Sequence, residues 1–334
     1  MAITLSRSRV APIVIKTESA YGTDPTPVMG TDDILSYDSP VPHALNVSRL
    51  ELRPHGNSLT RTTDIIAQRY GQVRFKTMWA GSGSAGTIAV NGFKAFAAAL
   101  GACGTVVEVA TGTPTKLRVR PSTVSEWEGD SVTVWTNHNG YIHELNGAYG
   151  DVTLTGTPRG SLECDFTFTG LYVDPVAVST TFDNWTGGTN RGKAFLGISA
   201  TITPSGGSAY TGIIESFTWR YGNTITPIDD ANSSTGTWGI LNVDKSPMIT
   251  MRIAQDNTGT NLTYPNLFTQ LFASTTHTLT FTHGTGTGNS SNFFFPQLQL
   301  VNITPTDNAG HRAIDLEYKV TGGTAESEFY CYIS

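Results

Sequence analysis

Six residues, Gly81-Ser82-Gly83-Ser84-Ala85-Gly86, match the GxGxxG pattern with which dinucleotide-binding proteins bring backbone amides close to a pyrophosphate. That chemistry requires a parallel strand–helix–strand unit whose helix begins at the last glycine. In this chain the next helical pattern begins only near Gly92, and alternating strand patterns surround the loop. We therefore interpret the segment as a flexible loop and predict no bound cofactor.

Two pairs of neighbouring carboxylates, Asp32-Asp33 and Asp229-Asp230, could supply an acid and a base for glycoside hydrolysis. Catalytic carboxylates usually lie about 5 to 9 Å apart on separate elements, so solvated turns are the better interpretation of both pairs. The seven histidines show no HxH or HExxH spacing, and the three cysteines form no CxxC pair. The sequence thus predicts neither an enzyme nor a metal site, and it predicts free thiols that pack as small hydrophobic groups.

A second set of carboxylates lies on predicted strands. Glu163 and Asp165 alternate with apolar residues in the segment 162–168, and Asp315 and Glu317 alternate with apolar residues in the segment 314–318. Because successive side chains of a strand point to opposite faces, each pair shares the face opposite the predicted core. An ordinary water-facing sheet surface would produce this pattern, and so would a charged wall beside a passing polyanion.

The elements that must position these residues are mainly strands. Only 14% of the residues are charged, while the chain holds 35 glycines and many Thr, Ser and Asn residues, a composition typical of strands and turns. The formal charge of −6 argues against tight binding of nucleic acid. No apolar run is long enough for a membrane helix, and the first fifteen residues lack the pattern of a secretory signal. The low charge suggests a surface that partners cover.

Four blocks of the first half recur in the same order in the second half. Residues 50–60 match 217–226, and residues 73–78 match 248–253. Residues 96–100 of the predicted helix 92–101 match 267–271, and the strand 105–109 after it matches 277–281. Residues 151–170 match 301–322. We infer a tandem duplication. The predicted organisation is an N-terminal arm (1–40), two β-rich domains (41–175 and 176–323), each with one flanking helix, and a C-terminal arm (324–334).

Three short segments carry a resemblance to a known family. They are Lys16-Thr17-Glu18-Ser19-Ala20-Tyr21-Gly22-Thr23-Asp24-Pro25-Thr26-Pro27, Ala99-Leu100-Gly101-Ala102-Cys103-Gly104 and Phe166-Thr167-Phe168-Thr169-Gly170-Leu171-Tyr172. In this order they resemble the tail tube (major tail) proteins of phages with long, non-contractile tails. The resemblance covers nearly the whole chain. The chain departs from the family at Gly101, where the family has an arginine, so no role is carried over for that residue.

The resemblance implies a structural virion protein with two tube domains, each a β-sandwich or barrel. Rings of the protein would stack into a tail tube that conducts DNA to the host cell, after assembly in the host cytoplasm and with other tail proteins at the tube ends. Two domains per chain favour a trimeric ring with pseudo-sixfold symmetry, and a hexameric ring is the alternative. Genomic DNA would pass without specific binding, and no membrane is involved. Glu163, Asp165, Asp315 and Glu317 would then line the lumen as an acidic wall.

The long polar segments 1–40, 53–72 and 221–247 are expected to be arms and loops that make contacts between rings. A different class of function stays open, namely an adhesive or carbohydrate-binding β-sandwich of a surface fibre or pilus. Such a protein would usually carry a signal peptide or a cluster of exposed aromatic residues, and the sequence shows neither clearly.

Overall fold

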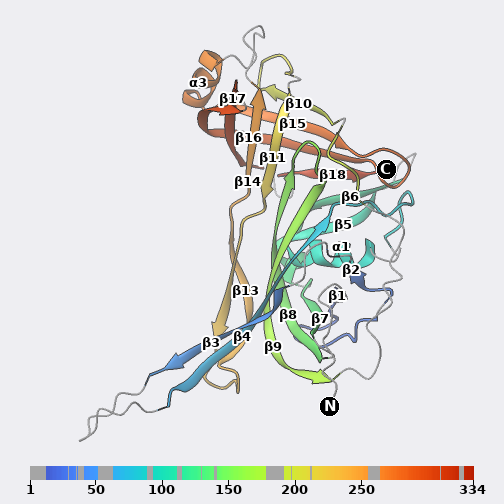
Figure 1. Cartoon of the computed structure of the whole chain (residues 1–334), viewed down its shortest axis with the longest axis vertical. Coiled ribbons are helices and arrows are strands. Elements are labelled where there is room, and N and C mark those ends of the chain that lie inside the picture. The colour runs from blue at the N-terminus through green and yellow to red at the C-terminus, as the bar shows by residue number, and fades with distance from the viewer. Residues whose placement is uncertain are drawn as a thin grey trace, which may run out of the picture.

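The computed structural model describes residues 13–28, 30–34, 36, 41–51, 63–88, 93–110, 115–128, 130–138, 141–177, 192–196, 198–210, 213–254, 264–308, 310–322 and 327–334. These residues form strands for the most part, and every strand pairing among them is antiparallel. The prediction of a mainly β protein is therefore confirmed (Figure 1).

The bounds of the elements are as follows. The first half contains β1 (Ile13–Thr17), β2 (Asp33–Ile34), β3 (Val41–Leu50), β4 (Ile65–Met78), α1 (Phe93–Ala102), β5 (Thr105–Ala110), β6 (Lys116–Pro121), α2 (Val124–Glu128), β7 (Val132–His138), β8 (Tyr141–Gly156) and β9 (Leu162–Ala177). The second half contains β10 (Ser199–Pro204), β11 (Ile214–Arg220), β12 (Asn223–Asp229), β13 (Thr237–Lys245), β14 (Met248–Ala254), α3 (Tyr264–Phe272), β15 (Thr276–His283), β16 (Ser291–Asn308), β17 (His311–Val320) and β18 (Tyr330–Ile333).

The helices α1 and α3 lie where the sequence predicted one helix in each half. Helix α1 buries Phe93, Phe96, Ala99 and Leu100, and its alanine-rich sequence favours the helical state. The short helix α2 was not predicted, because five residues carry too little periodicity to recognise.

The strands of the two halves pair in the same order. In the first half β3, β4, β9, β8, β7 and β1 are successive neighbours. In the second half β11, β14, β17, β16, β15 and β10 are successive neighbours. The strands β5 and β6 form an additional hairpin of the first half. The division into two domains with the boundaries given above stays a prediction, because the described residues form one continuous hydrophobic core cluster.

The pairings correct three of the matched blocks. Asp165 lies opposite Lys76, and Asp315 lies opposite Arg252, so residues 72–77 rather than 73–78 correspond to 248–253. By the same register residues 41–44, not 50–53, correspond to the end of β11. The strand that takes the place of β15 is β7, which pairs with β8, rather than β5. Sequence matching missed these shifts because a one-residue slip exchanges the two faces of a strand without disturbing its alternation.

The two halves are joined by strand pairing and by side chains. Residues 217–220 of β11 pair with residues 153–156 of β8, which links β3-β4-β9-β8 and β11-β14-β17-β16 into one run of eight strands. The ring of Trp79 lies 5.0 Å from that of Phe293, and its Nε1 donates to Ser291 Oγ at 2.9 Å. The junction is thus part of the hydrophobic core.

The described residues of both expected arms include strands that pack into the core. Residues 13–15 of β1 are buried and pair with β7, within the segment expected as the N-terminal arm. Residues 330–333, within the segment expected as the C-terminal arm, form β18, which lies between β6 and β16. Burial of Cys331 and Ile333 explains this position, because alternate side chains of β18 point into the core.

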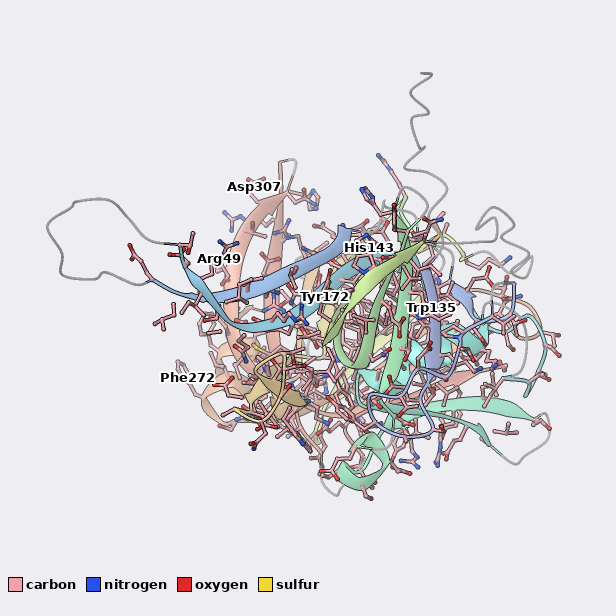
Figure 2. All side chains as sticks on the ribbon, turned by 90° about the horizontal axis from the view of Figure 1, so that it is seen from below. Arg49, Trp135, His143, Tyr172, Phe272 and Asp307 are labelled. Atoms are coloured by element: carbon pink, nitrogen blue, oxygen red, sulfur yellow. The ribbon has the colours of Figure 1, made fainter. Side chains whose placement is uncertain are left out.

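Two hairpins leave the main body. The β3–β4 arm projects at the lower left of Figure 1, and Arg49 marks it in Figure 2. The strands β12 and β13 form a separate two-stranded sheet. Residues 65–72 and most of 221–247 are therefore strands, and the expectation of loops is wrong for them; residues 53–62 of the expected segment 53–72 lie outside the described residues. Polar composition misled the prediction, since strands exposed on both faces need no apolar alternation.

Candidate functional site

The four carboxylates singled out by the sequence lie on one face of the eight-strand run. Leu162, Cys164 and Phe166 are fully buried on the opposite face of β9, and Leu316 and Tyr318 are fully buried on that of β17. The predicted alternation is thus present in both strands. Whether this face lines a lumen stays a prediction.

Two arginines on neighbouring strands bind two of these carboxylates. Arg74 Nε on β4 donates to Asp165 Oδ1 at 2.9 Å, and a second, short contact joins Arg74 Nη2 to Asp165 Oδ2. In the other half Arg252 Nε and Nη2 donate to Asp315 Oδ1 and Oδ2 at 2.7 and 2.9 Å. The duplicated feature is therefore a bidentate arginine–aspartate pair, a strong charge-assisted geometry. Each aspartate raises the pKa of its arginine.

Rows of paired residues cross both halves without a break. One row runs Lys76, Asp165, Thr153, Arg220, Met248 and Lys319, and the next runs Met78, Glu163, Thr155, Thr218, Thr250 and Glu317. Together with the row of Arg74, Thr167 and Asp151 and with the Arg252–Asp315 pair, these rows hold five basic and five acidic side chains among many threonines. The surface is balanced in charge and not acidic, which the alternation of single strands could not reveal.

The two outer strands of the eight-strand run, β3 and β16, have edges that correspond to the strands paired at the β8–β11 junction. Residues 141–148 of β8 pair with β7, and the rest of that edge pairs with β11. In the same way residues 291–299 of β16 pair with β15, but residues 300–308 have no second strand partner among the described residues. The outer edge of β3, the counterpart of β11, also has no partner in that part of the chain. These two edges present unpaired backbone groups of the kind that recruit another strand.

The N-terminal motif that contributed to the resemblance has a defined structural role. The Glu18 carboxylate is buried and accepts from the amides of Gly22 and Gly147, at 2.7 Å each. It also accepts from Ser131 Oγ at 2.8 Å and from Thr133 Oγ1 at 2.7 Å. Four donors compensate the burial of this charge, so Glu18 fixes the turn after β1 to β7 and β8.

Tyr21 connects this turn to the β12–β13 hairpin. Its ring stacks on Tyr149 and Trp238 with centroid distances of 6.2 and 6.3 Å, and its hydroxyl accepts from the amide of Ile240 at 2.6 Å. A Cβ at Gly147 would lie 2.7 Å from the ring, and one at Gly239 would lie 2.9 Å from the hydroxyl. No local sequence pattern indicates this role, because the partners of Tyr21 lie more than 120 positions away.

The hairpin in turn contacts the base of the β3–β4 arm. The Arg69 amide donates to the Thr235 carbonyl at 3.0 Å, and Thr237 Oγ1 donates to the Arg69 carbonyl at 3.3 Å. Gln68 Nε2 donates to Asp229 Oδ1 at 2.5 Å. The turn after β1, the β12–β13 hairpin and the arm therefore form a connected series of contacts.

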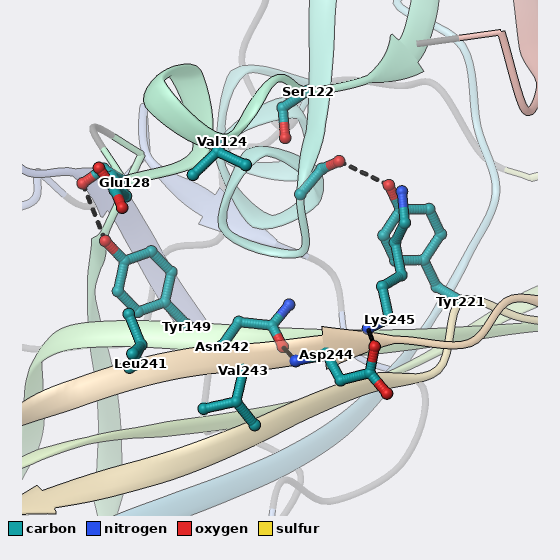
Figure 3. Close-up of a pocket in the computed structure, with 11 residues that line it drawn as sticks. Ser122, Val124, Glu128, Tyr149, Tyr221, Leu241, Asn242, Val243, Asp244 and Lys245 are labelled. Atoms are coloured by element: carbon teal, nitrogen blue, oxygen red, sulfur yellow. Dashed lines mark hydrogen bonds between the residues drawn. The ribbon is translucent and has the colours of Figure 1, made fainter. Parts of the chain in front are cut away.

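A cavity of about 260 Å³ lies between α2 and the β12–β13 hairpin (Figure 3). Val124, Leu241 and Val243 form its apolar part, and the hydroxyls of Tyr149 and Tyr221 donate to the carbonyls of Glu128 and Gly104 at 2.9 and 2.6 Å. These two hydroxyls serve the packing of the backbone. The cavity is the seam between the hairpin and the first half.

The other candidate chemistries resolve as follows. The Gly83 amide donates to the Gly288 carbonyl at 3.0 Å, and a Cβ at Gly81 would lie 1.9 Å from that oxygen. The glycine-rich segment is a loop, as expected, and it allows a close backbone approach between the halves. Burial raises the pKa of all three cysteine thiols. No group of three metal-ligating side chains occurs in the described ranges.

The two aspartate pairs differ. Asp230 accepts from the Asn232 amide at 2.8 Å in the turn between β12 and β13, beside an exposed Asp229, as expected of a solvated turn. Asp32 and Asp33 are buried, so the same expectation is wrong for them. Lys94 of α1 donates to Asp32 at 2.8 Å, which supplies a counter-charge that the local sequence does not contain. Burial raises the pKa of Asp33.

Comparison with known proteins identifies one family. A family model described as phage tail tube protein matches residues 8–320. No curated protein matches the chain. Among the described residues no helix has the length and apolar character needed to cross a membrane.

Proposed function

Because the chain belongs to the phage tail tube protein family, we propose that it is a structural subunit whose rings stack into the tube that conducts DNA to the host cell. Family membership makes it a structural component of the virion tail. The observation that supports ring formation is the β8–β11 junction, where one half of the chain extends the sheet of the other half. The edges of β3 and β16 offer the same kind of junction to further copies.

The proposed ring contains three chains with pseudo-sixfold symmetry. Each chain supplies two units, 41–175 and 176–323, and pairing of β16 of one copy with β3 of the next would repeat the junction within the chain. Closure would remove every exposed edge of the inner sheet. A ring of six chains is the alternative, in which the second unit would lie outside the wall.

The proposed lumen is the polar face that contains Glu163, Asp165, Asp315 and Glu317. Its support is the continuity of the polar rows over both halves and the apolar packing of the opposite face. Each arginine that an aspartate holds is less available to phosphate, so the wall would let a duplex pass without specific binding. Contacts between rings are assigned to the segments 1–40, 53–72 and 221–247, and other tail proteins would bind the tube ends. Assembly would occur in the host cytoplasm.

Electron microscopy of the purified protein tests this function. Tubes or stacked rings with threefold symmetry in averaged end views are the expected result. Monomers that remain dispersed at high protein concentration would contradict it and would favour the adhesive β-sandwich. Six chains per ring would refute only the pseudo-sixfold arrangement.

A further inference from the structure

The C-terminal ends of the two duplicated helices differ in burial. Residues 101–105, at the end of α1, are all buried. Residues 272–274, at the end of α3, are all exposed, and the Phe272 side chain is 81% exposed. Figure 2 shows Phe272 at the rim of the molecule. Equivalent helix ends in one chain thus have very different surroundings.

The second half of the chain covers the end of α1. Tyr221 is 1% exposed, and its hydroxyl donates to the Gly104 carbonyl at 2.6 Å. Asn223 Nδ2 donates to the Cys103 carbonyl at 2.8 Å. Tyr221 directly follows β11, the strand that pairs with β8, and Asn223 begins β12. The helix end is therefore buried by the residues that follow the strand at the junction between the halves.

The strand that corresponds to β11 is β3. Arg220 lies opposite Met248 in the second half, and Ala44 lies opposite Gln72, the counterpart of Met248, in the first half. Leu45 therefore corresponds to Tyr221. Its side chain is 44% exposed although Leu45 lies within β3, opposite Gly71 of β4.

We propose that the C-terminal end of α3, with Phe272 as its apolar anchor, is a docking surface for β3 of a second copy of this chain. Leu45 of that copy would occupy the position that Tyr221 occupies over α1. The inference rests on the proposed function, because it names the side chains that accompany the β16–β3 junction. An apolar contact replaces the tyrosine hydroxyl contact at this site, consistent with the exchange of a tyrosine for a leucine.

The backbone of β16 makes such a side-chain anchor necessary. The Tyr221 amide donates to the Val152 carbonyl at 3.0 Å, so the next hydrogen-bonded position of β8 is Leu154. Thr153 of β8 lies opposite Asp165, and Thr304 of β16 lies opposite Asp315. The neighbours of Thr153, Val152 and Leu154, therefore correspond to Ile303 and Pro305 in β16. Pro305 has no N–H to donate. Pairing at this edge therefore lacks one hydrogen bond of the junction within the chain, and side-chain burial must supply more of the affinity.

The test compares Phe272→Asp with Phe272→Leu in the full-length chain. Because Phe272 is exposed in the single chain, both variants should fold and melt like the parent protein. The aspartate variant should raise the protein concentration required for assembly by roughly tenfold or more, since it places a charge in an apolar contact. The leucine variant should assemble like the parent. Normal assembly of the aspartate variant would overturn the proposal.

A disulfide test provides a second measurement. In the double variant Leu45→Cys, Phe272→Cys, oxidation of assembled protein should produce covalent chain-to-chain ladders, and oxidation of dilute protein should not. The native cysteines are fully buried and should not contribute. A bond within one chain, or tubes without ladders, would refute this docking surface while leaving the tube function intact. A parent protein that never assembles would instead refute the tube function, and this inference with it.

Discussion

Removing the two aspartates that hold arginines should turn a neutral sheet face into one that binds DNA. The change is Asp165→Asn together with Asp315→Asn, which keeps the side-chain shape and releases Arg74 and Arg252. The side chains are 59% and 20% exposed in the first pair and 36% and 28% exposed in the second. Exposed pairs of this kind contribute about 0.2–1 kcal/mol each, so the double variant should fold with only a small loss of stability.

The effect on DNA binding should be larger. The five basic and five acidic side chains of these rows become five and three, and two guanidinium groups per chain become available to phosphates. Each phosphate contact steepens the dependence of log K on log salt by about 0.9, so the slope should steepen by roughly 2 per bound chain. The measurement is fluorescence anisotropy of a labelled duplex with assembled protein at several salt concentrations between about 50 and 200 mM.

A matched control separates the location from the total charge. Glu108→Gln together with Glu126→Gln also removes two carboxylates that hold arginines. Glu126 Oε1 accepts from Arg120 Nη2 at 2.7 Å and Glu108 Oε1 accepts from Arg118 Nε at 2.5 Å, but these pairs lie outside the eight-strand face. The control should bind DNA no more tightly than the parent protein. Equal binding by the control and the double variant, or unchanged binding by the double variant, would refute the assignment of this face to the lumen.

Three further predictions concern stability and folding. Tyr21→Phe should cost about 1 kcal/mol in urea unfolding, since the Ile240 amide loses its acceptor, and should speed hydrogen exchange in the β12–β13 hairpin; unchanged exchange would contradict this role. Burial lowers the pKa of His277 in the folded protein to about 4, so the free energy of unfolding is highest above about pH 6.5 and decreases as the pH falls toward 4. His277→Gln should reduce the decrease in the free energy of unfolding between pH 7 and 5 by about 2 kcal/mol. An equal decrease in both proteins would refute this. Deleting residues 1–15 should prevent folding rather than leave a folded monomer, because Ile13 and Ile15 are buried in β1; a cooperative thermal transition of the truncated protein would contradict it.

The sequence alone determined features that depend on local periodicity. Alternation in the segments 162–168 and 314–318 identified two central strands and the face that carries their carboxylates. Helical spacing placed a helix at 92–101, and the observed helix α1 spans 93–102. The ordered short motifs indicated the family that the comparison then identified. These features are predictable because the side-chain period of a strand or a helix depends on its own backbone and not on its neighbours.

Only the tertiary structure decided which segments are neighbours. Arg74 neutralises Asp165 from a position 91 residues away, so the sequence predicted an acidic face where the fold places a face of balanced charge. Tyr21 and Ile240 are separated by 219 positions, and no local sequence pattern predicts their contact. The same holds for the junction of β8 with β11, since the choice of strand partner depends on side chains from two distant segments fitting one face. Local propensity fixes what an element is, but pairing and register are properties of the assembled sheet.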